Sequence, residues 1–390
     1  MASQDRKDPI RLGISGLGLA GSMMIRAARR DPRFALVAGS DPLPRPRETF
    51  ARDFNARTHA DFAGMCADPE VEAIYIASPH EYHREQGIAA LEAGKHVLLE
   101  KPMALTIPDC DAVVEAADRA DTQLIVGHTH GFDSNVQAIR DLVRSGEMGR
   151  FAGLLNFNYN DFLYRPRRPE ELDTSRGGGI TFNQVMHQVE IARSIGGRVR
   201  SVRADTGSMD PRRPTEGNCT AFLDFEGGGA ASLVYSSYDY FDSDELHDWI
   251  AEGGTKKPPR DHGSTRRLFE SGAAPEDERH KDLGYGGNGL PDDQAHLPHF
   301  GLLIVTCEKG DIRLSPDGLH VYGHEGHREI AVERTAGWTG HGNALNALWD
   351  AVRLGRPDYH DARWGRASVE IILAILRSAR ERREIVLEHQ

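Results

Sequence analysis

Short apolar runs and amphipathic stretches alternate over the first third of the chain. The apolar runs, each with the length of a buried strand, lie at about 10–15, 34–38, 73–77, 96–99 and 124–126. Helical periodicity fills intervals between them, as at about 83–93 and 106–120. Apolar strands separated by amphipathic helices are typical of a doubly wound parallel sheet. We therefore predict an α/β domain over residues 1–128.

The pattern changes after residue 128. Helices are predicted at about 134–144, 341–354 and 361–379, and strands at about 151–159, 199–206, 218–225, 230–236, 302–307, 311–314 and 319–322. This order predicts a second domain over 129–390, of α+β class, with an open, predominantly antiparallel sheet and helices on one side. Residues 239–298 are rich in Gly, Pro and charged residues, and we interpret them as a surface insertion, a lid or a subunit contact.

A GxGxxG motif follows the first predicted strand and opens the first helix. In the context of a strand, a turn and a helix, this motif indicates a Rossmann dinucleotide-binding domain. Gly16 permits a tight turn, Gly18 lets backbone N–H groups approach a pyrophosphate, and Gly21 lets the helix pack on the strand. The start of the helix offers unpaired N–H donors and a partial positive charge to the phosphates.

The choice between NAD and NADP depends on the end of the second strand. Asp41 lies 20 residues after Gly21 (41 − 21), where a carboxylate bonds the adenosine ribose hydroxyls. Its charge would repel the additional phosphate of NADP, so we expect NAD. The nearby Arg45 and Arg47 leave NADP use open.

Composition excludes several classes of partner. The 390 residues carry a formal net charge of −12, with a pI of about 5.8, which argues against nucleic acid or an anionic membrane. Residues 1–8 lack the apolar core of a signal peptide, and no run approaches the ~18 apolar residues of a membrane helix. Four dispersed cysteines favour a reduced, cytoplasmic protein. His296 and His299 lack a Cys or carboxylate at ligand spacing, so we expect no metal site.

Two further segments carry candidate chemistry. Glu100-Lys101-Pro102 ends an apolar run, at the rim of the sheet where open α/β folds bind ligands. In the segment 177–190, three glycines allow the chain to pass close to a ligand. Asn183 and His187, four residues apart, would share one helix face. A histidine beside a lysine forms a plausible proton-transfer pair, whereas the alternative is a histidine on a helix surface.

Together these segments resemble the Gfo/Idh/MocA oxidoreductases. The GxGxxG turn and Glu100-Lys101-Pro102 match that family directly, residues 77–83 look like its AxPNxxH segment, and 177–190 look like its GGGxxxDxGxHxxD segment. The resemblance implies that Lys101 and His187 are the catalytic residues. The cofactor-binding residues that it implies, together with the motif, are Gly16, Gly18, Leu19, Ala20, Gly21, Asp41, Ser78, Pro79, His83, Glu100 and Lys101. Asn183 stands where the family has aspartate, and a neutral amide stabilises an imidazolium less well than a carboxylate does.

Within the family, the chain resembles the branch that acts on phthalate cis-4,5-dihydrodiol. Residues 127–133, 158–169 and 172–176 carry this likeness. It implies NAD-dependent oxidation of cis-4,5-dihydroxy-4,5-dihydrophthalate to the catechol 4,5-dihydroxyphthalate, in aromatic degradation. The substrate-binding residues that we expect are His130, Tyr164, Arg165, Arg168, Arg176, Asn183 and His187. Arginine forks bind carboxylates in a bidentate way, so this loop suits an anionic substrate, with Arg176 as first choice and Arg165, Arg167 and Arg168 as second choices.

Other functions remain open from the sequence. A sugar, inositol or polyol dehydrogenase of the same family has no evident use for four guanidinium groups in one loop. A non-catalytic regulator that binds NAD on this fold would not need both Lys101 and His187. The loop could also be a solvated basic surface balanced by its own acidic residues. We further expect a homodimer or homotetramer formed through the C-terminal sheet.

Overall fold

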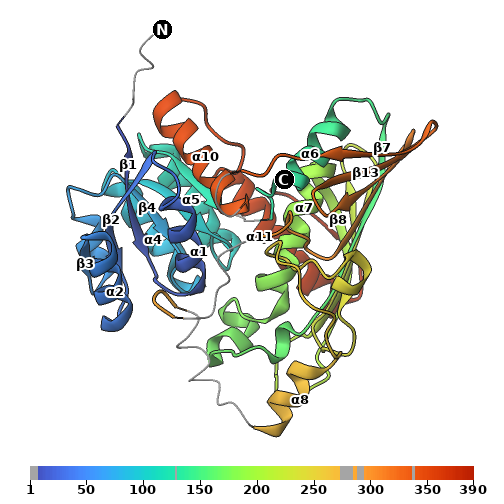
Figure 1. Ribbon diagram of the computed structural model, residues 1–390, viewed down its shortest axis with the longest axis horizontal. Coiled ribbons are helices and arrows are strands. Elements are labelled where there is room, and N and C mark those ends of the chain that lie inside the picture. Colours follow the sequence, from blue (N-terminus) through green and yellow to red (C-terminus); the bar gives the residue numbers. More distant parts are fainter. Residues whose placement is uncertain (1–7, 128–129, 273–283, 288–293, 336–338) are drawn as a thin grey trace.

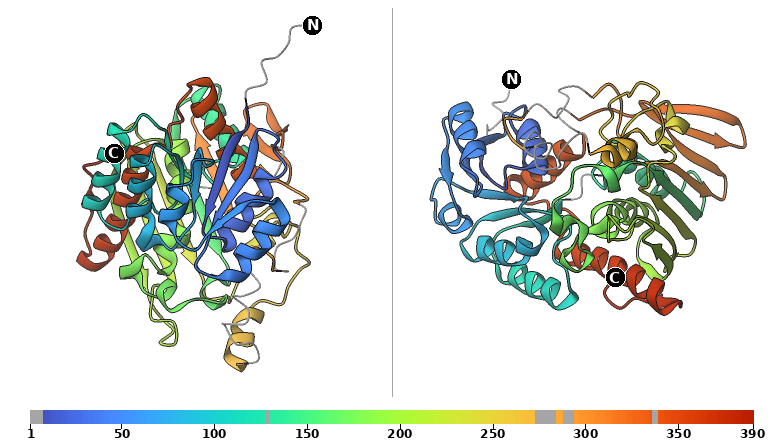
Figure 2. Two further views of the ribbon diagram at one scale, coloured as in Figure 1. Left: turned by 90° about the vertical axis from the view of Figure 1, so that its left-hand side faces the viewer. Right: turned by 90° about the horizontal axis from the view of Figure 1, so that it is seen from below.

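The structure, a computed structural model, has two lobes, each built around one sheet (Figure 1). It describes residues 8–127, 130–272, 284–287, 294–335 and 339–390. A six-stranded sheet forms the first lobe, and a nine-stranded sheet forms the second. Helices lie between the two sheets, as the view from below in Figure 2 also shows.

The first sheet is parallel throughout. Its strands are β1 (Ile10–Ser15), β2 (Phe34–Ser40), β3 (Arg57–His59), β4 (Ala73–Ile76), β5 (His96–Glu100) and β6 (Leu124–Gly127), in the spatial order β3-β2-β1-β4-β5-β6. The helices are α1 (Leu19–Ala28), α2 (Pro44–Phe54), α3 (Phe62–Cys66), α4 (His83–Glu92) and α5 (Ile107–Arg119). The strand order reverses between β1 and β4, which confirms the doubly wound prediction and places the ligand crevice at their carboxyl ends.

The second sheet is mixed. Its strands are β7 (Phe151–Tyr159), β8 (Val199–Gly207), β9 (Asn218–Phe225), β10 (Ala230–Ser236), β11 (Leu302–Cys307), β12 (Gly310–Ser315), β13 (Gly318–Gly323), β14 (Gly326–Ala331) and β15 (Ile385–Val386), in the order β14-β13-β12-β11-β7-β10-β9-β8-β15. Only the β7–β10 pairing is parallel among these described strands, so the predicted antiparallel character is confirmed. The pattern did not predict β3, α2, α3, β14 or β15, most of which are short or largely polar.

One face of the second sheet is covered by helices and the other is open (Figures 1 and 2). The covering helices are α6 (Ser134–Arg144), α7 (Met186–Gly196) and α11 (Ala362–Glu381). Ser232 of β10 pairs with Phe222 on one side and Leu155 on the other, so these three side chains share the open face. Phe222 is 50% exposed and Leu155 is 37% exposed. This face therefore presents apolar surface.

The end of the chain returns to the first lobe. Helix α10 (Thr339–Leu354) packs against α1, and its Ala344, Leu345 and Leu348 join the buried cluster around β1. Helix α11 contacts both α5 and β8. Residues 129–390 therefore do not lie in the second lobe alone, because α10 is part of the layer that covers the first sheet.

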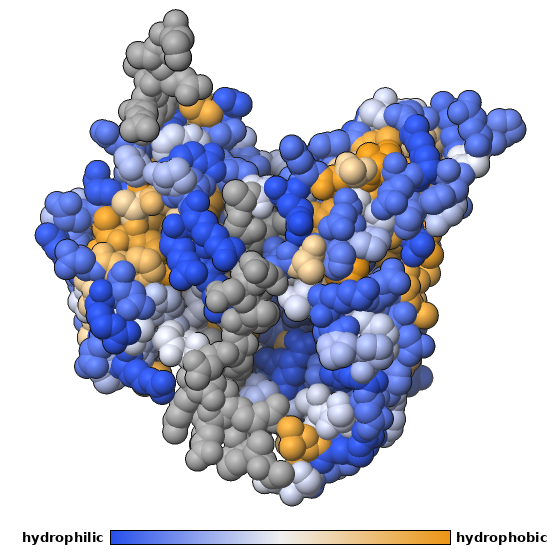
Figure 3. All heavy atoms as spheres, viewed as in Figure 1, coloured by the Kyte–Doolittle hydropathy of each residue, from blue (hydrophilic) through white to orange (hydrophobic). Residues whose placement is uncertain are grey.

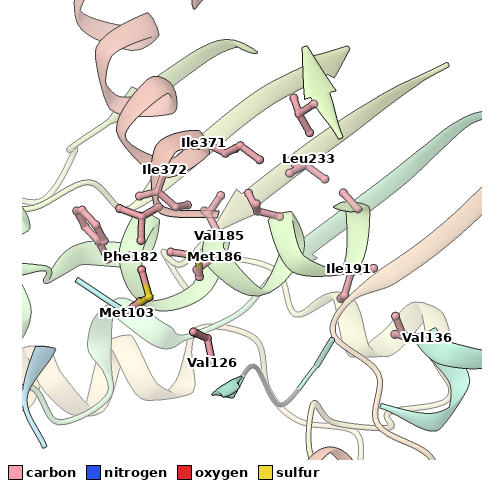
Figure 4. Close-up of a cluster of buried hydrophobic side chains, with 14 of the residues drawn as sticks. Met103, Val126, Val136, Phe182, Val185, Met186, Ile191, Leu233, Ile371 and Ile372 are labelled. Carbon is pink, nitrogen blue, oxygen red and sulfur yellow. The ribbon is translucent and has the colours of Figure 1, made fainter. Parts of the chain in front are cut away.

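A continuous apolar core connects the lobes below the loop that carries Lys101. Phe182, Val185 and Met186 point toward Met103 of the first lobe and Ile372 of α11 in Figure 4. All five are nearly inaccessible to solvent. This packing fixes the loop that follows β5 against the start of α7, so both candidate catalytic segments stand on rigid elements.

The insertion leaves the second sheet between β10 and β11. It contains a 3-10 turn, η6 (Ser243–His247), the helix α8 (Ser264–Ser271), and a short turn at 284–287 that lies against the first lobe, orange in Figure 1. The viewed surface is mostly hydrophilic, with separate apolar areas on each lobe (Figure 3). Across the described residues, we find no helix with the length and apolar character needed to cross a bilayer.

Candidate active site

The glycine turn has the geometry that a dinucleotide requires. Gly16 has φ +86°, and a Cβ there would lie 2.4 Å from Ala77 O, while a Cβ on Gly21 would lie 2.0 Å from Gly16 O. By contrast, a Cβ on Gly18 would meet no described atom within 4 Å, so it would extend into open space at the start of α1. Two of the glycines are required by packing, and the third keeps the approach to the helix clear.

The start of α1 and two neighbouring loops complete this cradle. Leu19 and Ala20 precede the first helical hydrogen bond, from Ser22 N–H to Gly18 O at 2.9 Å, so their N–H groups face the cradle as free helix-start donors. Ser78, which precedes Pro79 at the end of β4, has a buried Oγ without a hydrogen-bond partner among the described residues. An open helix start and an orphaned hydroxyl fit a bound dinucleotide.

Asp41 holds the turn from the end of β2. Its Oδ2 accepts the Leu17 N–H at 2.9 Å, and its Oδ1 accepts the Leu43 N–H at 2.9 Å. Each oxygen keeps a second lone pair for a ribose hydroxyl. Arg47 donates to the backbone oxygen of Asp41 at 2.5 Å, and Arg45 is exposed.

Lys101 lies at the carboxyl end of β5, directly before a cis peptide bond to Pro102. Its Nζ donates to the backbone oxygen of Asn183 at 2.7 Å, which ties the two candidate catalytic segments together. Burial lowers the pKa of Lys101 to about 8, against the opposing charges of Glu100 and Glu252, and the positive charge of Arg167 lowers it further. A lysine with this pKa can exchange a proton near neutral pH.

Glu100 and His83 support the lysine loop through contacts within the protein. The Glu100 carboxylate accepts from Tyr75 Oη at 2.5 Å, and burial raises its pKa. His83 is fully buried, with Nδ1 2.7 Å from Pro102 O and Nε2 2.8 Å from Ser78 O. Its ring therefore sets the distance between the loops that carry Ser78 and Lys101, and it does so from beneath the crevice.

The segment before α7 is a π-helix, Thr181–Val185, and not the regular α-helix expected from the spacing. Asn183 lies within this wider turn, and His187 lies in the first turn of α7. The Asn183 amide donates to Gly179 O at 2.8 Å and to Gly177 O at 3.4 Å. Asn183 therefore braces the glycine loop with its side chain and holds Lys101 with its carbonyl, and its role as a substrate ligand stays a prediction.

His187 stands in an aromatic group from three elements. Its ring centroid lies 4.7 Å from that of His130 and 5.1 Å from that of Phe300, and the His130 and Phe300 centroids are 4.5 Å apart. His130 Nδ1 contacts the buried carboxylate of Asp133 at 2.8 Å, a pairing that fixes the ring. His130 and His187, both predicted from the sequence as site residues, therefore lie side by side. Residues 128–129, which precede His130 in the predicted segment, lie outside the described residues.

Two of the expected substrate ligands, Arg176 and Arg168, are engaged by acidic side chains of the protein. The Arg176 guanidinium forms a bidentate pair with Glu81, with contacts of 2.8 to 3.0 Å, across the two lobes. Arg168 is half exposed and lies 3.4 Å from each of Glu170 and Glu171. Both guanidinium groups therefore already have carboxylate partners, which makes them weaker candidates for binding a substrate carboxylate than the sequence suggested.

Tyr164 points away from the crevice. Its hydroxyl donates to Asp210 at 2.9 Å, and its ring packs on Phe269 with a centroid distance of 5.5 Å. The side chain is buried in a small apolar cluster with Leu163 and Tyr238. Its hydroxyl and its ring are both engaged within the protein, which makes Tyr164 a weaker candidate for a substrate ligand than the sequence suggested.

Arg165 and Arg167 are the loop arginines whose charges act near Lys101. Arg165 donates to Asp161 at 2.8 Å and lies 3.5 Å from Glu252, the acid that also acts on Lys101. Arg167 stacks on the Phe162 ring, 3.6 Å from its centroid, and donates twice to the Phe162 carbonyl at 3.2 Å. Burial lowers the pKa of Arg167 to about 10, with a further decrease from Arg165.

Sequence reasoning missed two residues of this group. Tyr235 of β10 is buried, donates to Gln184 Oε1 at 3.0 Å and accepts from Asn160 at 2.7 Å, and the charges of Arg165 and Glu252 act on it. The sequence does give a signal for Tyr235, because it lies at an inward position of a strand with alternating pattern, and the hydroxyl of a buried tyrosine needs a polar partner. Glu252 comes from the insertion, and the local sequence gives no signal for it.

Comparison with known proteins identifies the family. Residues 10–128 match the oxidoreductase family with an NAD-binding Rossmann fold, and residues 136–252 match the GFO/IDH/MocA C-terminal domain. The chain belongs to the Gfo/Idh/MocA family. It is therefore an oxidoreductase with an NAD-binding Rossmann domain, and the cradle described above lies within that domain.

Several relatives within and near this family are informative. The chain is 39% identical over 376 residues to 1-carboxy-3-chloro-3,4-dihydroxycyclohexa-1,5-diene dehydrogenase of Comamonas testosteroni, which covers 94% of both chains. It is 31% identical over 199 residues to myo-inositol 2-dehydrogenase of Thermotoga maritima, which covers 50% of this chain and 58% of that one. A crystal structure of a putative dehydrogenase from Bordetella bronchiseptica RB50 superposes with a TM-score of 0.93 at 44% identity, covering 97% of this chain and all (100%) of the other.

The position of Asp41 predicts the cofactor preference of this family member. A carboxylate at the adenosine ribose repels the additional phosphate of NADP, so kcat/KM should favour NAD by at least about tenfold. Replacing Asp41 with serine should narrow that ratio, because the repulsion is removed. Steady-state kinetics with both cofactors provide the measurement, and an equal or better efficiency with NADP in the unmodified protein would contradict the assignment.

Proposed function

We propose that this protein oxidises a cis-dihydrodiol bearing a ring carboxylate, with NAD as the oxidant, to the corresponding catechol. The observation that carries the proposal is that Lys101, which Asn183 O holds at 2.7 Å and whose pKa burial lowers to about 8, lies within electrostatic reach of the largely buried Arg167. Lys101 supplies a proton acceptor, and Arg167 supplies a site for an anion close to it. The Comamonas testosteroni relative is named for a carboxylated ring diol, which supports the same substrate class.

The ion pairs of the loop favour one carboxylate over two. Arg165, Arg168 and Arg176 each have a carboxylate partner within 2.8 to 3.4 Å. Among the described residues, the ion pair of Arg167 is a longer one, 3.6 Å to Glu171, although its side chain is only 13% exposed. A buried guanidinium gains most from a further carboxylate, because the anion offsets its desolvation. A monocarboxylate dihydrodiol therefore fits better than the dicarboxylate of phthalate, which the sequence likeness suggested.

The reaction follows from the placement of Lys101. NAD, when bound, supplies the hydride acceptor. Lys101 Nζ takes the hydroxyl proton from the carbinol whose C–H is lost as hydride, so the C–O bond becomes a carbonyl. The ring ketone then loses the proton from the neighbouring carbinol carbon while its oxygen gains one, which yields the aromatic catechol. Asn183 O, 2.7 Å from Nζ, holds the lysine in position for the first transfer.

His187 is proposed to orient the diol. Its ring lies against His130 and Phe300, one turn after the residue that holds Lys101. Phe300 also stacks on Tyr235, at a centroid distance of 6.4 Å, so aromatic surface continues toward Gln184. A flat cyclohexadiene ring packs well on such surface, and the imidazole offers a hydrogen bond to a hydroxyl.

The lysine predicts how the rate depends on pH. Only neutral Lys101 accepts a proton, so kcat/KM should rise as pH increases through about 8 and level off above that value. Initial rates measured from well below to well above this pH test the assignment. A rate that falls as pH rises through this range would show that the protonated form of Lys101 is the active one.

A substrate panel tests the proposed function. We would measure NADH formation with benzoate-type and phthalate-type cis-dihydrodiols, an uncharged cis-dihydrodiol, inositol and glucose. The expected order of kcat/KM places the monocarboxylate first and the sugars last. A higher kcat/KM for inositol or glucose than for every dihydrodiol would overturn the proposal in favour of a polyol dehydrogenase, the activity in the name of the Thermotoga maritima relative.

Self-association through the second sheet stays a prediction. The open face carries Phe222 and Leu155, with Ile304 beside Leu155 in the register. Apolar side chains in the middle of an open sheet support an isologous contact between two copies, because such a face is otherwise left in water.

A further inference from the structure

The insertion of the second lobe makes a specific contact with the cofactor-binding lobe. The Tyr285 N–H donates to Leu17 O at 2.9 Å, and the Tyr285 hydroxyl donates to Asp53 Oδ2 at 3.1 Å. Its ring packs against Phe50 and Phe54 of α2, with centroid distances of 5.9 Å to both. Tyr285 is therefore bound to the first lobe through its backbone, its ring and its hydroxyl.

The neighbours of Tyr285 are shaped for this contact. Gly287 N–H donates to Gly284 O at 3.0 Å, which closes a tight turn. A Cβ on Gly284 would lie 3.4 Å from Leu17 O. Gly286 has φ +83°, and a Cβ there would lie 2.9 Å from Thr49. The turn at 284–287 thus lies against the first lobe with little room for larger side chains.

The atom that Tyr285 contacts belongs to the glycine turn. Leu17 lies between Gly16 and Gly18, and its N–H is held by Asp41 Oδ2 at 2.9 Å. Both backbone polar groups of Leu17 are therefore fixed, one by the carboxylate predicted to bind ribose and the other by the insertion. Any movement of Leu17 would displace the donors at the start of α1 together with Asp41.

We propose that Tyr285 is a positioning residue for NAD, through which the substrate-domain insertion holds the glycine turn in its binding conformation. The proposal depends on NAD binding and is independent of which substrate is oxidised. Tyr285 acts through Leu17, so it needs no direct contact with the cofactor. Because Leu17 also connects to Asp41, the contact should affect both the affinity for NAD and the discrimination against NADP.

The test uses the full chain with Tyr285→Ala, Gly286→Val and Tyr240→Ala. Gly286→Val displaces the turn through its contact with Thr49 and leaves the tyrosine in place. Tyr240 lies in the same insertion with 70% of its surface exposed, so its variant is the matched control. We would measure NADH affinity by fluorescence without substrate, the Tm of the free protein, and kcat/KM for NAD and NADP.

The expected result is an increase in the Kd for NADH of about fivefold or more in both turn variants, typical of a coupling between distinct sites. The ratio of kcat/KM with NAD to kcat/KM with NADP should fall in both turn variants, while their kcat at saturating NAD should remain close to that of the unmodified protein. Tyr240→Ala should match the unmodified protein in NADH affinity, in kcat and in this ratio. Unchanged NADH affinity and cofactor ratio in folded Gly286→Val protein would overturn the proposal. A lower Tm with both of those values unchanged would likewise assign the contact to stability alone.

Discussion

Replacing Lys101 with methionine should lower kcat by about 100-fold or more, the effect of losing a positioned acid–base group. Methionine keeps most of the apolar stem but cannot accept the hydroxyl proton. The rate with the proposed dihydrodiol, at saturating NAD, is the measurement. The rise of rate through a pKa of about 8 should disappear in the same variant, because the group responsible for it is gone.

Two controls separate the chemistry from structural damage. Lys256 is an exposed lysine of the insertion, and Lys256→Met should retain full activity. NADH affinity should also survive in Lys101→Met, since Nζ is directed at Asn183 O and not at the glycine turn. Turnover within a few-fold of the unmodified protein in Lys101→Met would remove Lys101 from the proton transfer.

The second large effect is expected at Arg167. A charge-assisted hydrogen bond contributes about 1.5–3 kcal/mol, so Arg167→Met should lower kcat/KM for the carboxylated dihydrodiol by about 10- to 150-fold. The uncharged dihydrodiol should be nearly unaffected, because it has no group for this guanidinium to bind. The adjacent Arg168 is the matched control, since its charge is balanced by Glu170 and Glu171, and Arg168→Met should change neither value.

Arg167→Met should also change the pH profile. The positive charge of Arg167 lowers the pKa of Lys101, so its removal should move the rising limb to higher pH. A loss of kcat/KM equal for charged and uncharged substrates, with no movement of the limb, would contradict a carboxylate contact at Arg167. The loop would then be a structural support for the crevice.

Local sequence predicted the features that depend on neighbouring residues. The glycine turn needs a left-handed φ at Gly16 and close packing at Gly21, and only glycine satisfies both requirements. Lys101 follows from its place at the end of an apolar strand, where the rim of a parallel sheet collects ligands. These motifs therefore indicated the cofactor lobe before any long-range contact was considered.

The substrate loop could not be predicted in the same way, because several of its polar side chains are paired with distant residues. Arg176 is paired with Glu81, which lies 95 residues earlier in the chain. Tyr164 is paired with Asp210, and Arg165 with Glu252. A run of arginines shows that positive charge is present, but only the fold decides which of them remains available to a substrate.

The sequence pattern likewise could not predict the π-helical backbone at 181–185 or the contact that the insertion makes with the first lobe. The residues 181–185 have apolar spacing compatible with an α-helix, and the π-helical turn that presents Asn183 O to Lys101 depends on packing against both lobes. Tyr285 lies in a segment rich in glycine and charge that predicts only a loop. Its contact with Leu17 joins residues 268 apart (285 − 17), for which the sequence gives no indication.

The most direct test of the proposed reaction follows NADH and catechol together while the protein converts a cis-dihydrodiol with one ring carboxylate. Equal amounts of the two products are expected at every time, because one hydride transfer and one aromatisation accompany each turnover. Absence of NADH with this substrate, or NADH without catechol, would contradict the central claim.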